Sequence, residues 1–288
     1  MHYLILTSLV WAFSYGLIKS NLGNLDPNFV TAARMACALL VFTPFLRIKS
    51  VSIFKALQLI LIGAVQYGLM YLCFLRSFQY LEAYQAALFT VTTPIYVILF
   101  NDLFERKFNR SYMKAALLAV LGGIIIYYKN INTPNILHGF ILVQLSDICF
   151  AFGQVAYKRL RARAPQIKDA QVYGMLFFGA LSVAIFATTY NYGWHSALDM
   201  TLRQILVLIY LGCIASGLCF FMWNKGAVTT NTATLAVFNN LKSPLAITVS
   251  ILFFHEQTAN IPRLAIGLSL IAIALFLAER YSRTKASI

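Results

Sequence analysis

Charged side chains are scarce in this chain of 288 residues, of which only 11% are Asp, Glu, Lys or Arg. An ordinary soluble domain has about 25% charged residues, so the scarcity excludes an ordinary soluble fold. Hydrophobic residues make up 60% of the chain. They recur in charge-free runs of about 20 residues, the length of helix that spans about 30 Å of hydrocarbon. The sequence therefore predicts an all-α, polytopic membrane protein.

Several motifs that carry chemistry are missing from the sequence. It has no GxxxxGK[ST] loop, no HExxH, no GxSxG and no CxxC pair. The five cysteines lie inside apolar runs, where they are typical of small packing residues. The four histidines fall near helix ends or loops, so they share no helix face. We therefore expect no cofactor, no metal site and no enzymatic activity; a membrane-embedded enzyme or a membrane scaffold is the alternative from another class.

The net charge of +14 does not indicate a nucleic-acid partner. The basic residues form short clusters between apolar runs, with no basic helix face and no aromatic platform between them. The first apolar run, from MHYLILTSLVWAF, follows no basic segment and precedes no small-residue cleavage site. We therefore expect this run to stay in the membrane as a helix.

Apolar runs bounded by turn and charge signals predict ten transmembrane helices. Their ranges are 3–18, 28–46, 56–76, 82–102, 113–128, 137–157, 171–190, 203–222, 229–253 and 262–279. The halves, 1–130 and 131–288, look related: WAFSYGLIK (11–19) aligns with FAFGQVAYK (150–158), and Pro94 with Pro244. Because each half has five helices, the second repeat would be inverted relative to the first. Inverted repeats are typical of secondary carriers, whose substrate sites lie near the midplane between repeats.

The basic residues also predict an orientation. With a cytoplasmic N-terminus, the inside loops carry Arg47, Lys49, Lys55, Arg106, Lys107, Arg110, Lys114, Lys158, Arg159, Arg161, Arg163, Lys168, Lys225, Arg280, Arg283 and Lys285. The opposite loops carry Lys19, Arg76, Lys129, Arg203 and Arg263. By the positive-inside rule, both termini should face the cytoplasm.

Three charged residues, Arg34, Asp147 and Lys242, fall well inside predicted helices. An ionised group at the centre of a membrane helix costs about 2.5–3.5 kcal/mol on insertion scales. A water-filled substrate cavity is one explanation, and a role in helix assembly alone is the other. The three charges together favour the cavity.

Further polar residues share helix faces with these charges, and Gln144, Asp147 and Gln154 form one stripe on the sixth predicted helix. Pro244 removes a backbone donor on the ninth, beside a polar segment. The candidate substrate-binding residues that result are Trp11, Ser14, Tyr15, Arg34, Gln66, Tyr67, Tyr71, Gln144, Asp147, Gln154, Asn239, Asn240 and Lys242. Trp223 is either a further ligand or an anchor at the membrane interface.

The chain resembles the EamA type of the drug/metabolite transporter superfamily over its whole length. The resemblance rests on the ten-helix, two-repeat plan, the opening LVWAFSYGLIK, Arg34 in the second helix, and an acidic residue after a helix in each half, Glu105 and Glu256. Within the superfamily, RMACALLVFTPFLR (34–47), LVQLSDICFAFGQVAYKRL (142–160) and VFNNLKSP (237–244) are similar to the bacterial biotin carriers. Asp147 and Lys242 depart from that pattern, which has uncharged or titratable polar residues there.

This resemblance implies a secondary active transporter that imports biotin across the bacterial cytoplasmic (inner) membrane by alternating access. The candidate residues offer cations for the biotin carboxylate, amide and carboxyl groups for its ureido ring, and aromatic rings for its apolar part. A zwitterionic amino acid would fit an acid, a base and an aromatic wall equally well. A carrier or exporter of amino acids or other small metabolites is therefore the alternative, and the sequence carries no signature of direction, coupling ion or oligomeric state.

Overall fold

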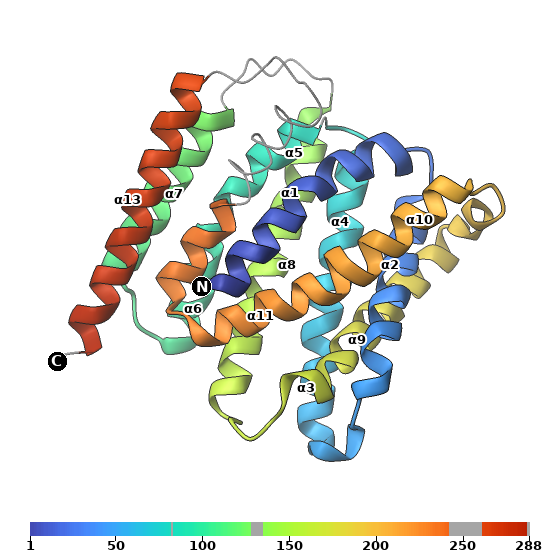
Figure 1. Ribbon diagram of the computed structural model, residues 1–288, viewed down its shortest axis with the longest axis horizontal. Coiled ribbons are helices and arrows are strands. Elements are labelled where there is room, and N and C mark those ends of the chain that lie inside the picture. Colours follow the sequence, from blue (N-terminus) through green and yellow to red (C-terminus); the bar gives the residue numbers. More distant parts are fainter. Residues whose placement is uncertain (82, 128–134, 242–260, 287–288) are drawn as a thin grey trace.

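The computed structural model describes residues 1–81, 83–127, 135–241 and 261–286, and within these ranges the regular structure is helical throughout (Figure 1). The α-helices are α1 (His2–Leu22), α2 (Pro27–Phe42), α3 (Ile53–Gly63), α4 (Met70–Ser77), α5 (Ala83–Phe89), α6 (Thr93–Glu105), α7 (Arg110–Tyr127), α8 (Ile136–Ala162), α9 (Asp169–Tyr190), α10 (Leu202–Tyr210), α11 (Cys219–Thr229) and α13 (Ile261–Ala286). Short 3₁₀ or π segments are η1 (Thr43–Phe45), η2 (Ile48–Ser50), η3 (Ala64–Leu69), η4 (Thr90–Thr92), η5 (Gly193–Ala197) and η6 (Leu211–Leu218). Residues 232–241 are also helical.

Seven of the described helical segments are long and apolar enough to cross a membrane. They are His2–Leu22, Pro27–Phe45, Ile53–Ser77, Gln85–Glu105, Ile136–Ala162, Asp169–Tyr190 and Leu202–Thr229. The prediction of an all-α fold is thereby confirmed for the described residues, and the seven candidate spans agree with a multi-pass membrane protein. Each predicted helix range overlaps a described helix, although 229–253 is described only as far as residue 241. Ten crossings and an inverted second repeat stay predictions.

Local sequence signals explain where several helices begin. Asp26 caps α2, because its carboxylate accepts hydrogen bonds from the backbone N–H groups of Asn28 and Phe29, both at 2.9 Å. Thr201 and Gln204 form a capping box at the start of α10. Pro94 lies in the first turn of α6, where its missing N–H costs nothing.

Two of the long segments contain a π-helical stretch in their middle. The segment η3 joins α3 to α4 and contains Gln66 and Tyr67; η6 joins α10 to α11 and contains Ser216. A π-helical stretch inserts an extra residue into the turn and often marks a functional site. Both stretches lie beside the pocket described below.

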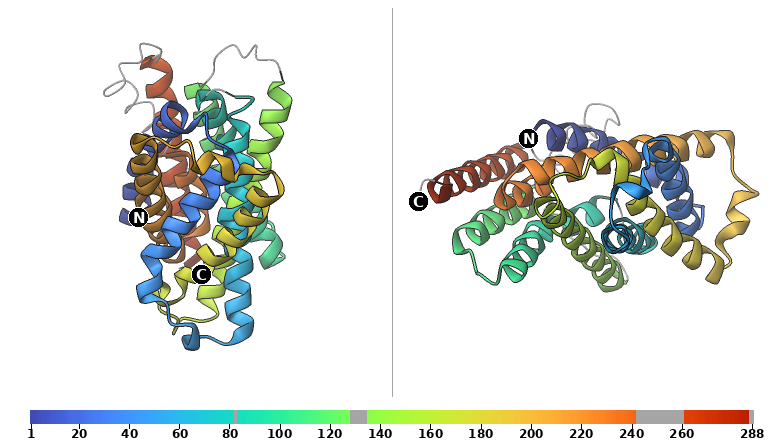
Figure 2. Two further views of the ribbon diagram at one scale, coloured as in Figure 1. Left: turned by 90° about the vertical axis from the view of Figure 1, so that its right-hand side faces the viewer. Right: turned by 90° about the horizontal axis from the view of Figure 1, so that it is seen from below.

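Helices from the two halves of the chain pack against each other, so the halves do not form separate cores. Helices α2 and α3 of the first half contact α9 of the second half. In the same way α4 contacts α8, and α1 contacts α11. At one edge of the molecule α7 and α13 lie side by side, as Figures 1 and 2 show. The centre of the bundle is thus shared by both halves of the sequence.

Glycine permits the closest of these contacts. A Cβ atom on Gly179 of α9 would lie 2.0 Å from the carbonyl oxygen of Ile60, and one on Gly63 of α3 would lie 1.9 Å from that of Leu176. No side chain fits at such distances, so α3 and α9 are in backbone contact. Small residues at helix crossings are typical of membrane proteins.

Candidate functional site

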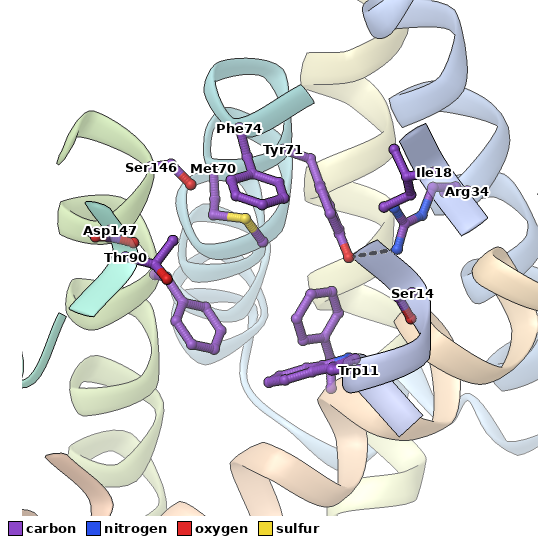
Figure 3. Close-up of a pocket in the computed structure, with 12 residues that line it drawn as sticks. Trp11, Ser14, Ile18, Arg34, Met70, Tyr71, Phe74, Thr90, Ser146 and Asp147 are labelled. Carbon is purple, nitrogen blue, oxygen red and sulfur yellow. Dashed lines mark hydrogen bonds between the residues drawn. The ribbon is translucent and has the colours of Figure 1, made fainter. Parts of the chain in front are cut away.

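A pocket lies between the helices of the bundle, with an empty volume of about 590 Å³ that includes space open to its surroundings. Helices α1, α2, α4, α8 and α11 and the segment η4 contribute its walls (Figure 3). The lining residues are Trp11, Ser14, Ile18, Arg34, Met70, Tyr71, Phe74, Thr90, Ser146, Asp147, Phe150 and Phe220. Both halves of the chain therefore contribute to one cavity.

Arg34 is buried at one wall of the pocket, with 1% of its surface exposed. Its Nη2 donates to the Tyr71 hydroxyl at 2.6 Å and to Ser216 Oγ at 3.0 Å, and its Nε donates to Ser216 Oγ at 3.2 Å. The guanidinium also lies over the Tyr71 ring, with Cζ 4.2 Å from the centroid. Its Nη1 is buried and has no hydrogen-bond partner among the described residues. A buried cation held by hydroxyl groups, with one nitrogen unsatisfied, can bind an anionic or strongly accepting ligand.

Asp147 lies on α8 across the pocket from Arg34, as Figure 3 shows. It is 4% exposed, and its Oδ2 accepts a hydrogen bond of 3.3 Å from Thr92. Gln144, one turn earlier, accepts from Thr92 and Tyr96 at 2.8 and 2.9 Å and donates to the Phe89 carbonyl. The pocket therefore has a basic residue and an acidic residue on opposite walls.

Aromatic rings occupy much of the wall around Trp11. The Trp11 ring lies 5.2 Å from Phe220 and 6.0 Å from Phe150 in edge-on contacts, and 5.1 Å from Trp223. Its Nε1–H donates to the Ala215 carbonyl at 2.8 Å, which fixes the ring orientation. Trp223 is fully buried, so the alternative that it anchors the protein at the membrane interface is wrong.

Two other candidate residues, Gln66 and Tyr67, lie outside the pocket lining, in a buried hydrogen-bonded network with Asn224. Gln154 accepts from Trp223 Nε1 at 2.9 Å and is paired with Asn239 at 3.5 Å. The polar stripe predicted on the sixth helix thus faces inward, although only Asp147 among its polar members lines the cavity.

Asn240 holds helices together: its side-chain nitrogen donates to the carbonyls of Val91 and Ala119, both at 3.0 Å. The side chain of Tyr15 and the whole of Lys242 lie outside the described residues. The pocket therefore brings together Trp11, Ser14, Arg34, Tyr71 and Asp147 from the sequence-predicted set.

The candidates predicted from the sequence lack several residues that line the pocket, among them Phe150 and Phe220. They also lack Ser216, which is not part of the lining but accepts hydrogen bonds from Arg34. Phe150 follows Asp147 by one helical turn, and that spacing was a usable signal. Phe220 and Ser216 carried none, because a Phe or a Ser in an apolar helix is ordinary.

Comparisons with known proteins agree on one family. The sequence profile of the EamA-like transporter family matches residues 1–128 and 137–278. A probable biotin transporter of Pseudomonas aeruginosa is 41% identical over 278 residues, covering 96% of each chain. The biotin transporter of Escherichia coli K12 is 35% identical, covering all of this chain and 95% of the relative. That of Salmonella typhimurium is 36% identical, with 98% and 93% covered.

A solved crystal structure of another protein has a TM-score of 0.74 with this chain at 15% sequence identity, covering 98% of this chain and 97% of the other. At that identity the likeness concerns the fold alone. The profile matches and the relatives, which are similar over almost the full length, lead to one conclusion. This chain is a membrane transporter that belongs to the EamA-like transporter family.

Proposed function

We propose that this protein is a secondary active transporter that imports biotin across the bacterial cytoplasmic membrane by alternating access. The observation that carries the proposal is the pocket, which presents a buried cation, a buried carboxyl residue and aromatic rings in one cavity. The names of three relatives at 35–41% identity support biotin as the substrate.

The polar groups of biotin are complementary to the residues on the two opposite walls of this pocket. Its carboxylate would accept from the unsatisfied Arg34 Nη1, beside Tyr71 and Ser216. Its ureido ring has two N–H donors, and Asp147 on the opposite wall is an acceptor. The thioether ring and chain are apolar and would pack between Trp11 and Phe220. Lys242 stays a second candidate for the carboxylate outside the described residues.

Two repeats that rock about this cavity would expose it to each side of the membrane in turn. The division at residues 130/131 is supported by the two separate matches to the family profile. A contact between the connection after α2 and the first turn of α9 supports the proposed orientation: the backbone N–H of Arg47 donates to the carbonyl of Gln171 at 2.9 Å. The start of α9 follows the basic loop after α8, so the two basic loops lie at the same edge, which the positive-inside rule assigns to the cytoplasm.

Uptake of labelled biotin tests the proposal in a bacterial host that lacks both biotin synthesis and biotin uptake. We expect saturable uptake that the empty host lacks. We expect Trp11→Phe to raise KM about two- to tenfold, since aromatic packing contributes about 0.5–1.5 kcal/mol beyond area burial.

Trp194→Phe is the matched control for this variant. Trp194 also donates its Nε1–H, to Thr189 Oγ1 at 3.0 Å, but it lies in η5 and does not line the pocket. We expect its KM to equal that of the wild type. Uptake of a labelled amino acid instead of biotin, by protein shown to be in the membrane, would replace the proposal with the metabolite alternative.

A further inference from the structure

A buried polar network lies directly beyond the pocket along α11. Phe220 lines the pocket, and Asn224 follows it by one turn toward the Thr229 end of the helix. Gln66 Nε2 donates to Asn224 Oδ1 at 2.9 Å, and Asn224 Nδ2 donates back to Gln66 Oε1 at 3.1 Å. Both side chains are completely buried. The two amides therefore form a reciprocal, fully buried pair one helical turn beyond Phe220.

Tyrosine hydroxyls extend this network across the bundle. Asn224 Nδ2 also donates to the Tyr67 hydroxyl at 2.8 Å, and the Tyr67 and Tyr173 hydroxyls are hydrogen-bonded at 2.5 Å. The Tyr173 hydroxyl donates to the Phe220 carbonyl at 2.5 Å. The Tyr67 ring stacks on Phe220 with centroids 4.3 Å apart. The network thus joins η3, from the first half of the chain, to α9 and α11, from the second half.

The hydrogen bonds of this network are satisfied internally, in contrast to those of Arg34. Among the described residues, the buried side-chain atoms without a partner are Arg34 Nη1 and Asn240 Oδ1, and neither belongs to the network. A ligand would have to break existing bonds to reach Gln66 or Tyr67. Such a network is more typical of a closed contact between the two halves of the chain than of a binding surface.

We propose that Gln66, Tyr67 and Asn224 form the gate that closes the pocket on the side of Thr229, and that they do not bind substrate. The proposal rests on the proposed transport function, since it assigns these residues to the step in which the pocket opens to that side. A polar gate suits this task because water replaces its hydrogen bonds when it opens, so that opening leaves no buried group unsatisfied. While the gate is closed, its packed side chains prevent water and solute from passing between the pocket and the Thr229 side.

Thiol labelling of two reporter positions tests the gate without any substrate. In a cysteine-free background, Ala227→Cys reports beyond the gate, on α11 and fully buried, and Ser146→Cys reports from the pocket wall. We expect Asn224→Ala to raise the labelling rate of Ala227→Cys by about tenfold or more, because the closed state loses its buried hydrogen bonds. We expect it to slow the labelling of Ser146→Cys, because the pocket closes on one side as it opens on the other.

A merely structural role would give a different result. If Asn224→Ala only loosened the packing, both reporters would be labelled faster, which would contradict the gate. An unchanged labelling rate at both reporters would also contradict it. Gln204→Ala is the matched control: it also removes a buried amide with long-range hydrogen bonds, to Asn21 and Asn24, but at the far end of the same helical segment. We expect it to leave both labelling rates unchanged.

A second variant covers the case in which Asn224→Ala does not fold. The double substitution Gln66→Met with Asn224→Leu replaces both amides by apolar groups of similar size, which leaves no buried donor unpaired. We expect this gate to stay shut: biotin binds with an affinity within about threefold of wild type, Ala227→Cys stays protected, and transport stops. Loss of biotin binding in this variant would make Gln66 or Asn224 a ligand and overturn the proposal.

The labelling results and the transport function can fail separately. Absence of biotin uptake by the wild type would reject the substrate while the reporters still show whether the gate exists. Normal biotin uptake with unresponsive reporters would reject the gate and leave the substrate in place.

Discussion

The Arg34 guanidinium is buried in a helix that crosses the membrane, and its position has an energetic cost. An isolated cation at that depth costs about 2.5–3.5 kcal/mol on insertion scales. The hydroxyls of Tyr71 and Ser216 satisfy part of its hydrogen-bonding capacity without neutralising its charge. A substrate anion at Nη1 would supply the missing charge.

Substitution of Arg34 tests this role. We expect Arg34→Gln to weaken biotin binding by at least about tenfold, which corresponds to about 1.4 kcal/mol, because a charge-assisted hydrogen bond is lost. Equilibrium binding to purified protein measures the change. Ser216→Ala is the control, since it removes a neighbour of the guanidinium and keeps the charge; we expect a change of less than about threefold. Equal losses in the two variants, at equal thermal stability, would contradict a direct contact with Arg34.

At this scale the sequence predicts which residues matter better than it predicts their partners. Arg34 and Asp147 stand out because ionised groups are rare in apolar helices. The partner of Arg34, Ser216, is 182 positions away, and nothing local indicates the pairing. Gln66 is likewise a candidate ligand from the sequence, because its partner Asn224 is distant along the chain and the pairing has no local signal. In the structure its hydrogen bonds to Asn224 favour a role in the gate.

The packing of whole elements depends on glycine at the α3–α9 crossing. A Cβ on Gly179 would meet the Ile60 carbonyl oxygen at 2.0 Å, whereas one on Gly174, on the same helix, would meet the end of the Leu46 side chain at 3.3 Å. Backbone cannot move aside without separating the helices, but a flexible side chain can.

Matched alanine variants on α9 test this crossing. We expect Gly179→Ala to destabilise the protein by about 1–3 kcal/mol, the usual cost of overpacking, and Gly174→Ala to change its stability by less than about 0.5 kcal/mol. Thermal unfolding of the two variants in the same detergent measures the difference. Similar melting temperatures would show that the backbone contact does not hold α3 and α9 together.

Helix positions can be predicted from apolar runs, but the irregular turns within them cannot. The sequence places one continuous helix over 56–76, whereas the structure has a π-helical stretch at Ala64–Leu69. No proline lies in that stretch, and the residues are compatible with an α-helix. The π-helical stretch packs against α8 and α9. We attribute the choice between the α-helical and π-helical geometries to these contacts, which the local sequence does not encode.

For the whole molecule, the distribution of basic residues predicts the orientation in the membrane. We expect reporter fusions within residues 163–168 and after residue 286 to be active only as cytoplasmic reporters, and fusions within residues 191–200 only as exported ones. Paired fusions of alkaline phosphatase and a fluorescent protein measure this. Phosphatase activity at 163–168 would show that the orientation is the opposite of the predicted one. The proposed gate would then lie on the outer side of the membrane.

The shared centre of the bundle could be predicted only in part from the sequence. Two related halves predict a site between them, and the pocket does take residues from both. The pairings of α2 with α9 and of α1 with α11 depend on three-dimensional packing that single-helix patterns do not encode.

Transport by the purified protein tests the central claim most directly. In proteoliposomes preloaded with unlabelled biotin, we expect the wild type to accumulate labelled biotin by exchange, and Arg34→Gln to reduce this at low concentrations of external biotin. Exchange of a labelled amino acid without any exchange of biotin, by protein that is folded and inserted, would contradict the account.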